Sequence, residues 1–545
     1  MLPRLKPPPL ALPPSAAVLA AIALAFVLPG LAGHDPWKTH DAIGIGIAHG
    51  MLSSGDGLVP RVAGMPWLYD PPLYHWLAVV FGWPLQFLLE FHAAARIASG
   101  TLVLLAFCLI YRAARDWQPD AQKREAASAA FLLLLGSLGL IVHAHEALPE
   151  LAALAALCGA LAALPHASRR PLGAGAAFGG ALGLAFLSAS WIAPLALGLA
   201  VAAAHLVCEE WRNRNGLLFT VSFVLVAALV AGSWPLALYL RSPELFTYWW
   251  LLASLPQGGF GANLRYFLVT ASWFTWPAWP IAAWALWSLR RRLAEPRLFV
   301  PFAASAAMLA AIGFWGPQQD VNLIMLLPPL ALLAAQGALV LRRGAAGALD
   351  WFGVLAFGFF TFLVWLGYFS MLTGLPPRVA NNFFKSAPGF VLELKAWPLL
   401  VAGALFLGWL YVMFFSTRSP VRSVARWAAG IVLLWGSFAT LWMPWADYVK
   451  SYRSVALQLR STIPVDSGCI AQRSLGISQA AALDYHAAIR PQPFDTLKPE
   501  ACPLLLVQGS PKNEFDGPGP GWTKLADVGR PGDKSERYRL YQFSK

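Results

Sequence analysis

The chain has 545 residues, of which 58% are hydrophobic and only 12% are charged. Soluble domains carry about 25% charged residues, so this composition excludes an ordinary soluble enzyme, and the high hydrophobicity excludes a disordered chain. A net charge of +13 would suggest nucleic acid binding in a soluble protein, but in a membrane protein the distribution of the charge matters more than its size. We therefore expect a polytopic membrane protein with no nucleic acid partner.

The charged residues divide the chain into two parts. Residues 446–545 hold 23 of the 67 charged residues, and the first 445 residues hold the other 44. We expect a membrane part over 1–445 and a soluble tail over 446–545. A membrane-spanning helix needs about 20 mostly apolar residues, which predicts about thirteen spans. Their centres lie near residues 24, 104, 136, 157, 181, 200, 228, 281, 306, 332, 361, 406 and 436.

Basic residues set the expected orientation of these spans. With the N-terminus in the cytoplasm, 19 Lys and Arg residues of the membrane part fall on cytoplasmic loops and 8 fall elsewhere. This bias follows the positive-inside rule. An odd number of spans then places the tail on the periplasmic side of a bacterial inner membrane. Residues 16–32 could instead be a cleaved signal peptide, which would remove the first span without reversing the tail.

Acidic residues gather on the predicted outer side. Asp and Glu contribute little to topology, so the orientation rule does not require this clustering. A water-facing group of acids beside a bilayer can carry acid–base or metal chemistry, or it can be ordinary solvated loop charge. The carboxylates outside the tail and the cytoplasmic loops are Asp35, Asp41, Asp56, Asp70, Glu90, Glu146, Glu150, Glu244, Asp320 and Glu393.

Residues 34–76 form a long loop directly after the first predicted span. Ile43, Ile47 and Met51 have helical spacing, so a helix over 41–52 could lie flat on the membrane. The sequence SSGDG ends this helix, and four prolines hold the rest of the loop in extended and turn conformations. Loops of this length commonly carry function, so we expect the catalytic site here.

The order of motifs in this loop resembles that of the GT-C glycosyltransferases. An acidic motif follows the first span, then a GD-x-x-VP turn, then a G-x-P…PPL-x-x-W element. The chain is most similar to the bacterial branch of the protein mannosyltransferase and lipid A aminoarabinose transferase relatives. The segments WFTWPAWPIAAWALW (273–287) and LLPPLALLAAQG (326–337) also match, as do the span count and the outer C-terminal domain.

The resemblance implies transfer of a sugar from a polyprenyl-phosphate carrier to a lipid, glycan or protein acceptor on the outer leaflet. In the family an Asp-Glu pair opens the loop helix, and its Asp serves as general base or metal contact. His40 and Asp41 hold these positions, so Asp41 is the first candidate base and Asp35 the second, with His40 as a further catalytic candidate. A second family acid follows the third span, near Glu146, with Glu150 as the alternative. Asp41 and Glu146 could share a divalent ion, the one cofactor that these residues suggest.

The phosphate of the carrier needs cations on the outer face. Close relatives often carry Glu-Lys before the PPL element, where this chain has Tyr69 and Asp70, so phosphate binding by that Lys is not carried over. Arg matches phosphate bidentately, although each of these residues could equally have an ordinary polar or interfacial role. The candidates for substrate and phosphate binding are Lys38, Arg61, Tyr69, Asp70, His75 and Arg265, with Arg241, Arg378 and Lys385 as further cations.

The tail alternates predicted helices and strands, which favours a small α/β domain. Such a domain could cover the entrance of the site or contribute to acceptor recognition. The closing RYRLYQF is expected to be an edge strand. The other predicted elements are an amphipathic helix over 451–463, a short apolar run at 468–471, a helix over 475–489 and a strand over 503–508.

Two cysteines lie in the tail. An oxidising compartment would let Cys469 and Cys502 form a disulfide, with two free thiols as the alternative. The other three cysteines lie in apolar spans and suit packing.

Two other functions share this composition. A transporter or lipid flippase would need charges near the bilayer midplane and internal repeat symmetry, and the sequence indicates neither. A polymerase or ligase of lipid-linked glycans would lack the PPL-x-x-W loop. The sequence therefore predicts a polytopic α-helical glycosyltransferase of GT-C architecture, with a periplasmic α/β domain at its C-terminus.

Overall fold

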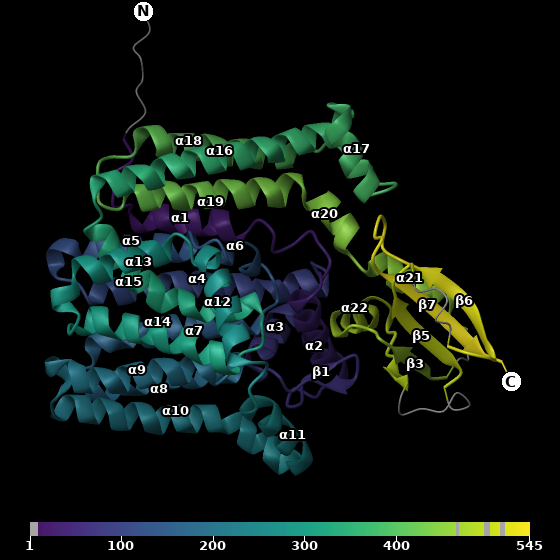
Figure 1. The fold of residues 1–545 in the computed structure, drawn as a ribbon, viewed down its shortest axis with the longest axis horizontal. Helices are drawn as coiled ribbons and strands as arrows, with labels where there is room; N and C mark the ends of the chain where they lie inside the picture. Colours follow the sequence, from purple (N-terminus) through teal and green to yellow (C-terminus); the bar gives the residue numbers. More distant parts are fainter. Residues whose placement is uncertain (1–8, 465–467, 495–501, 513–517, 545) are drawn as a thin grey trace, which may run out of the picture.

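The computed structural model describes residues 9–464, 468–494, 502–512 and 518–544. Long apolar helices lie side by side, and a mixed sheet domain sits at one end of them (Figure 1). Within the described residues, nine helices are long and apolar enough to cross a membrane, so the chain is a multi-pass membrane protein. They are α4 (Phe91–Asp116), α7 (Pro149–Ala163, continued by the 3₁₀ turn η2, Leu164–His166), α8 (Pro171–Ser188), α10 (Arg214–Arg241), α14 (Pro296–Trp315), α15 (Leu327–Leu339, preceded by the 3₁₀ turn η5, Asp320–Leu326), α16 (Arg343–Thr373), α18 (Ala396–Phe415) and α19 (Arg422–Leu441).

The four remaining predicted spans correspond to shorter helices. Three of them contain the predicted centres, and the fourth, α5, ends one residue before the centre near 136. The count of thirteen spans stays a prediction, because these helices are too short to cross a bilayer by length alone. They are α1 (Ala16–Val27), α5 (Lys123–Leu135), α9 (Ile192–Val207) and α13 (Ala278–Ser288).

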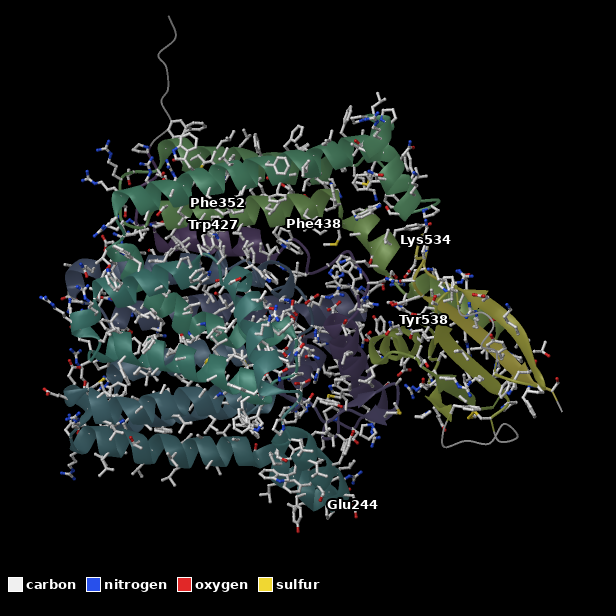
Figure 2. The ribbon with its side chains drawn as sticks, viewed as in Figure 1. Glu244, Phe352, Trp427, Phe438, Lys534 and Tyr538 are labelled. Carbon is white, nitrogen blue, oxygen red and sulfur yellow. A yellow bond between two sulfur atoms is a disulfide. The ribbon has the colours of Figure 1, made fainter. Side chains whose placement is uncertain are left out.

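Small residues and aromatic rings hold the long helices together. Gly179 of α8 faces α10 so closely that an added Cβ atom would lie 2.3 Å from the carbonyl oxygen of Phe223. Such close approach of small residues is typical of membrane helices. Between α16 and α19, the rings of Phe352 and Trp427 stack with centroids 5.8 Å apart (Figure 2). These contacts pack the long helices closely against one another.

The first loop folds at the same end of the bundle as the tail (Figure 1). The predicted loop helix is present as α2 (His40–Ser54), and a hairpin follows it, with β1 at Arg61–Val62 and β2 at Met65–Pro66. The PPL-x-x-W element begins a further helix, α3 (Leu73–Leu85). Gly44 brings α2 against the chain before α7, since an added Cβ atom would lie 2.0 Å from the carbonyl oxygen of Ala147.

The remaining helices are short. They connect the long helices or lie at the end that carries the loop and the tail. They are α6 (Leu140–His143), α11 (Pro243–Ser254), α12 (Phe260–Phe274), α17 (Pro377–Ser386) and α20 (Met443–Lys450). The predicted domain boundary after residue 445 falls inside α20 and stays a prediction.

The tail is an α/β domain, as predicted, with a five-stranded mixed sheet in the order β4-β3-β5-β7-β6. β3 pairs in parallel with β4 and β5, and β7 pairs antiparallel with β5 and β6. Apolar residues of the two helices pack on the sheet with Leu506 and Leu540. The elements are α21 (Arg453–Thr462), β3 (Ile470–Arg473), α22 (Ile477–Ala487), β4 (Gln492–Pro493), β5 (Leu504–Gly509), β6 (Trp522–Val528) and β7 (Arg537–Phe543).

One prediction for the tail was wrong. RYRLYQF forms β7, which is an interior strand and not an edge strand, because β6 pairs along its outer side. The burial of Tyr538 and Leu540 reflects this interior position. The structure also joins Cys469 and Cys502 in a disulfide, which links the start of β3 to the start of β5.

Small and apolar side chains bring the tail onto the first loop. Gly46 of α2 faces Ala481 of α22, and Ala481 also packs with Ile47, Met51 and Val62. The tail therefore rests directly on the loop that the sequence predicts to be catalytic.

Candidate functional site

A cavity of about 640 Å³ lies at the end of the bundle, where the first loop meets the tail. Its wall comes from α2, the turn before α3, the starts of α7 and α9, α11, the segment before η5, and the first turn of α22. One set of lining residues is polar: Lys38, His40, Asp70, His75, Glu150, Gln319, Asn322, Ser478 and Gln479. The other set is mostly aromatic: Trp67, Tyr69, Phe186, Trp191, Trp249, Leu252, Leu255 and Trp315.

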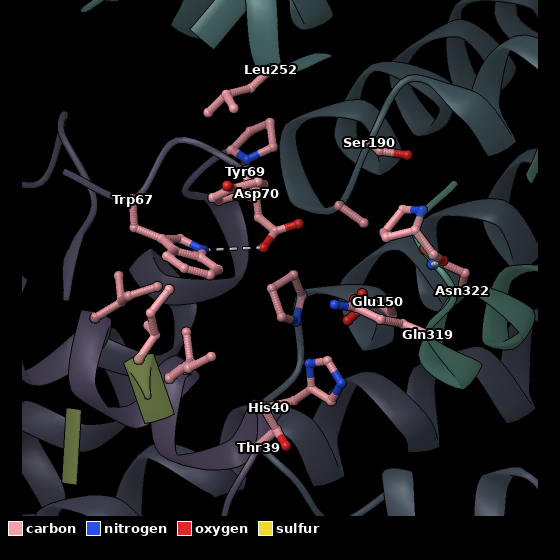
Figure 3. A pocket seen from close by; sticks show the side chains of 18 of the residues that line it. Thr39, His40, Trp67, Tyr69, Asp70, Glu150, Ser190, Leu252, Gln319 and Asn322 are labelled. Atoms are coloured by element: carbon pink, nitrogen blue, oxygen red, sulfur yellow. Dashed lines mark hydrogen bonds between the residues drawn. The ribbon is translucent and has the colours of Figure 1, made fainter. Parts of the chain in front are cut away.

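Two carboxyl groups enter this cavity from different elements. Asp70 comes from the turn before α3, and Glu150 comes from the first turn of α7; both are drawn in Figure 3. Burial raises the pKa of Asp70 to about 8, and the nearby negative charge of Glu150 adds to this effect. The indole nitrogen of Trp67 donates a hydrogen bond to Asp70 Oδ2 at 3.4 Å. A carboxyl group with such a pKa can exchange protons near neutral pH.

Two histidines that the sequence predicts to be site residues also line the cavity. His40 is the first residue of α2, and Figure 3 shows it in the cavity below Glu150. His75, in the first turn of α3, is 1% exposed. The backbone of Gly44 lies near its ring, but neither ring nitrogen has a hydrogen-bond partner of ordinary geometry among the described residues. Buried polar groups normally have partners, so His75 is a group that a bound molecule could satisfy.

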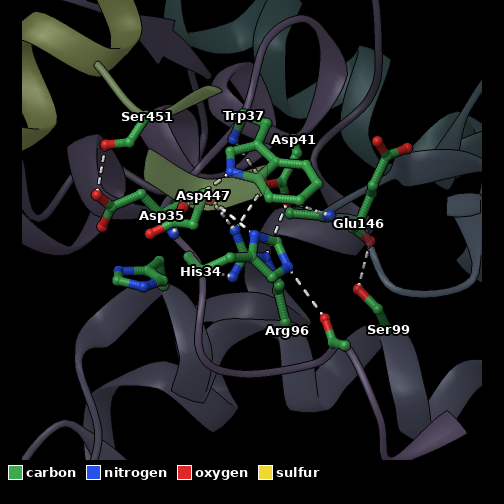
Figure 4. Close-up of polar contacts among 12 residues, drawn as sticks. His34, Asp35, Trp37, Asp41, Arg96, Ser99, Glu146, Asp447 and Ser451 are labelled. Atoms are coloured by element: carbon green, nitrogen blue, oxygen red, sulfur yellow. Dashed lines mark hydrogen bonds and ion pairs between the residues drawn. The ribbon is translucent and has the colours of Figure 1, made fainter. Parts of the chain in front are cut away.

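Asp41 lies outside this cavity, in a buried ion pair with Arg96 of α4 (Figure 4). Arg96 Nε donates to Asp41 Oδ1 at 3.0 Å, and Arg96 Nη2 donates to Oδ2 at 2.6 Å. The backbone N–H groups of Trp37 and Ala147 also donate to this carboxylate. Burial alone would raise the pKa of Asp41, but the Arg96 guanidinium outweighs it and lowers the pKa.

Asp35 is also buried, in a contact between the loop and the tail. Its carboxylate accepts hydrogen bonds from Ser451 Oγ at 2.5 Å and from Arg453 Nη2 at 2.5 Å. Burial alone would raise the pKa of Asp35, but these hydrogen bonds lower it to about 2. The expectation of a water-facing acidic cluster was therefore wrong for Asp35 and Asp41. Each has an arginine partner that compensates the cost of burial.

Glu146 lies in a third group of charges. Its Oε2 atom lies 2.7 Å from His143 Nδ1, and His143 Nε2 lies 3.5 Å from Asp320 Oδ2. Burial would lower the pKa of His143, but these two carboxylates outweigh it and raise the pKa to about 10. The imidazolium thus joins the end of α6 to the start of η5, and Asn322 of η5 lines the cavity.

The structure separates the candidate phosphate-binding cations. Lys38 is the one Lys or Arg among the described residues that line the cavity, and its Nζ atom lies 2.5 Å from Glu536 Oε1 of the tail. Arg61 lies in the β1–β2 hairpin and donates to the carbonyl oxygen of Gly64. Arg265 lies on an exposed face of α12. The predicted residues gathered in the cavity are Lys38, His40, Tyr69, Asp70 and His75, together with the alternative acid Glu150.

The predicted metal ligands, Asp41 and Glu146, are already engaged by other side chains. The oxygens of Asp41 accept the hydrogen bonds of Arg96, and Glu146 is paired with His143. Within the described residues, one group of three acid or His side chains is compact enough for an ion, namely Asp35, Glu90 and His92. Arg453 already bridges the two carboxylates of that group, with Nη2 2.5 Å from an oxygen of each.

Sequence reasoning missed the arginine partners of these acids. Arg96 is a lone charge near the start of an otherwise apolar span, and such a residue is commonly functional or paired in a membrane protein. That signal was available from the sequence. Arg453 gave no comparable signal, because a basic residue in an amphipathic tail helix is ordinary.

Comparisons with known proteins agree with this architecture, although no protein-family model matches the chain. The chain is 25% identical over 445 residues to the undecaprenyl phosphate-α-4-amino-4-deoxy-L-arabinose arabinosyl transferase of Serratia proteamaculans, which covers 78% of this chain and 75% of that protein. It is 24% identical over 484 residues to the transferase of the same name from Aeromonas salmonicida, which covers 84% of this chain and 82% of the relative.

Solved structures share the whole fold. The crystal structure of ArnT from Cupriavidus metallidurans bound to undecaprenyl phosphate superposes with a TM-score of 0.69 at 18% identity, over 96% of this chain and 97% of that chain. The apo structure of the same protein gives a TM-score of 0.70 at 18% identity, with the same coverage. The chain therefore has the fold of these ArnT structures and is similar in sequence, over most of its length, to undecaprenyl phosphate aminoarabinose transferases.

Proposed function

We propose that this protein transfers a monosaccharide from a polyprenyl-phosphate-linked donor to a lipid, glycan or protein acceptor. The observation that carries the proposal is the composition of the cavity, which joins a polar wall with two carboxyl groups to a wall rich in Trp. An amphiphilic donor presents the same two surfaces, a charged headgroup and an apolar chain. The names of the relatives, which are undecaprenyl phosphate aminoarabinose transferases, support this class of donor.

Asp70 and Glu150 supply the base in this proposal. A hydroxyl acceptor must lose its proton as it attacks the anomeric carbon of the donor sugar. Asp70 lines the cavity, and its pKa is raised to about 8, so its carboxylate can accept a proton near neutral pH as a general base does. Glu150 assists by holding that pKa high. His40 lies within the same cavity and orients or relays protons in this scheme.

Asp41, Asp35 and Glu146 have positioning roles in this proposal. The carboxylate of Asp41 is occupied by Arg96 and by two backbone N–H groups, so it fixes the start of α2. Asp35 joins the loop to Arg453 of the tail, and Glu146 fixes His143. A divalent ion at Asp41 and Glu146 would have to replace these partners, so no step here depends on one.

We propose that the reaction takes place at the periplasmic face of a bacterial inner membrane. The excess of Lys and Arg on alternate loops supports this orientation of the first loop and the tail. A disulfide between Cys469 and Cys502 suits an oxidising compartment and agrees with it. The carrier chain would enter from the bilayer beside α11, where Leu252 and Leu255 line the cavity.

Radiolabelled polyprenyl-phosphate sugars, incubated with the purified protein and membrane extracts, test the proposal. We expect label in a new covalent product, and a loss of at least 100-fold in rate for Asp70→Asn, as for removal of a general base. Glu393→Gln is the matched control, because Glu393 is an exposed outer-side acid that does not line the cavity. Label that only crosses the bilayer, with no covalent product, would instead support a transporter or flippase.

A further inference from the structure

Lys38 is held by the tail through a short chain of polar contacts. Glu536 Oε1 pairs with Lys38 Nζ, and Glu536 Oε2 accepts a hydrogen bond from the Tyr452 hydroxyl at 2.8 Å. Gln479 Nε2 donates to the same hydroxyl at 3.5 Å. Lys38 and Gln479 both line the cavity, so these contacts place its one described cation beside the first turn of α22.

The first turn of α22 forms part of the cavity wall. The wall includes Gly476, which caps the helix, and the three residues after it. The first N–H groups of a helix have no partner within the helix and carry its positive dipole end, so they bind anions. A second and independent observation points to a ligand in this cavity, since the ring nitrogens of the buried His75 lack a partner of ordinary geometry.

We propose that Lys38 and the first turn of α22 form a phosphate subsite, which the C-terminal domain completes. The assignment rests on the proposed function, because it makes the carrier phosphate of the donor the occupant. The residue in place of the family lysine, Asp70, is a carboxyl group and cannot hold a phosphate. The cation must therefore come from elsewhere, and Lys38 is the described cation that the cavity offers.

This subsite stabilises the leaving group. The acceptor oxygen forms a bond to the anomeric carbon while the bond from that carbon to the carrier phosphate oxygen breaks. The electron pair of the broken bond stays on that oxygen, and the acceptor proton passes to Asp70. The phosphate thus changes from a diester with one negative charge to a monoester with more. Lys38 and the N–H groups of α22 stabilise the negative charge that develops on that oxygen in the transition state more than they stabilise the bound donor, and this difference accelerates the reaction.

Glu536 competes with phosphate for Lys38. The side chain of Lys38 is 42% exposed and that of Glu536 is 14% exposed, so the ion pair lies at the edge of the cavity. Burial would raise the pKa of Glu536, but Lys38 and two tyrosine hydroxyls outweigh it and lower the pKa, so the residue stays ionised. A phosphate must displace this carboxylate to reach the ammonium group. Removing the charge of Glu536 should therefore favour phosphate binding.

The test is binding of undecaprenyl phosphate to the full-length protein in nanodiscs, without donor sugar or acceptor. We expect Lys38→Met to weaken binding at least tenfold and Glu536→Gln to tighten it severalfold. Ile477→Pro removes one N–H group at a helix position that tolerates proline, and should weaken binding severalfold. Lys395→Met is the matched control, since Lys395 is exposed and does not line the cavity.

Opposite shifts for the two partners separate this proposal from a purely structural ion pair. A structural role would make Lys38→Met and Glu536→Gln alter binding in the same direction, and that result would overturn the proposal. The double variant should bind as weakly as Lys38→Met alone. Inorganic phosphate should compete with the carrier for the wild-type protein and lose this effect in Lys38→Met. Equal competition in both would also overturn the assignment.

The proposed function and the subsite can fail separately. Carrier binding that depends on Lys38, with no sugar transfer to any acceptor, would leave the subsite intact and remove the transferase activity. Sugar transfer by a Lys38→Met protein that binds the carrier as tightly as the wild type would overturn the subsite and leave the proposed transferase activity intact.

Discussion

Asp41 and Arg96 form an ion pair that is closed to solvent, with 0% of each residue exposed and 2.6 Å between Arg96 Nη2 and Asp41 Oδ2. The pair fixes the start of α2 against α4. Arg96 Nη1 also donates to the carbonyl oxygen of His34, and Arg96 Nη2 donates to that of Asp35. One guanidinium thus organises the whole beginning of the first loop.

Asp41→Asn should destabilise the protein. It leaves Arg96 buried without its counter-ion, which costs about 3–5 kcal/mol for a buried pair. Adding Arg96→Met should recover most of this loss, because replacing both partners is nearly neutral. Thermal unfolding in nanodiscs measures both effects. If the stable double variant transfers sugar, Asp41 is not the base; if it is stable and inactive, the catalytic prediction for Asp41 survives.

The same pair makes stability depend on pH. The pKa of Asp41 is lowered in the folded protein, so the pair contributes fully above the ordinary pKa of an aspartate, about 3.9. The contribution falls as the pH drops through the lower pKa of the folded state. The difference in unfolding temperature between wild type and Asp41→Asn should therefore shrink only in strong acid. A difference that vanishes near pH 6 would contradict this account.

Transfer activity should rise with pH up to about 8. Asp70 acts as a base only when ionised, and its pKa is raised to about 8 by burial and by Glu150. Glu150→Gln removes the neighbouring negative charge, so the pKa of Asp70 should fall and the rise in kcat/KM should move to lower pH. A profile recorded from pH 5 to 9 tests this. An unchanged midpoint in Glu150→Gln would show that Asp70 does not control the rate.

The sequence patterns predicted much of the fold. The period of apolar residues predicted α2 and the nine long helices of the described residues, and the alternation of predicted helices and strands predicted the α/β tail. The order of the strands could not be predicted, because β6 (Trp522–Val528) has no strong strand pattern and its pairing makes β7 an interior strand. A single stretch of sequence says which side chains point the same way along one element. It does not say which elements meet.

The site was harder to predict for the same reason. Lys38, His40, Tyr69, Asp70 and His75 lie in one loop, and their gathering in one cavity followed from that proximity. The partners that decide their roles come from far away in the chain. Arg96 is 55 residues from Asp41, and Glu536 is 498 residues from Lys38. Asp41, for which the sequence shows no partner, is therefore paired with Arg96 in the structure.

Gly44→Ala should disrupt the site. An added methyl carbon would lie 2.0 Å from the carbonyl oxygen of Ala147, and backbone atoms cannot yield to it cheaply. α2 would move away from α7 and carry His40 out of the cavity. We expect a large loss of activity and a lower unfolding temperature. Gly173→Ala is the control, because its added Cβ atom would meet nothing within 4 Å.

Arg453→Met should loosen the tail on the first loop. Arg453 bridges Asp35 of the loop and Glu90, which precedes α4, so its removal leaves Asp35 mostly buried with one partner fewer. Limited proteolysis should cut the chain between α20 and α21 several times faster. Arg460→Met, in the same helix but exposed, serves as the comparison. Equal cleavage rates in the two variants would argue against the bridge.

The division of the cavity wall between two parts of the chain has a practical consequence. The contact of Gly46 and Ile47 with Ala481 is small and apolar, and it keeps α22 over the polar wall. An inhibitor that bound between α2 and α22 and separated them would disrupt the cavity without resembling a polyprenyl carrier or a sugar. Such a compound could be water-soluble, which few molecules shaped like a polyprenyl lipid can be.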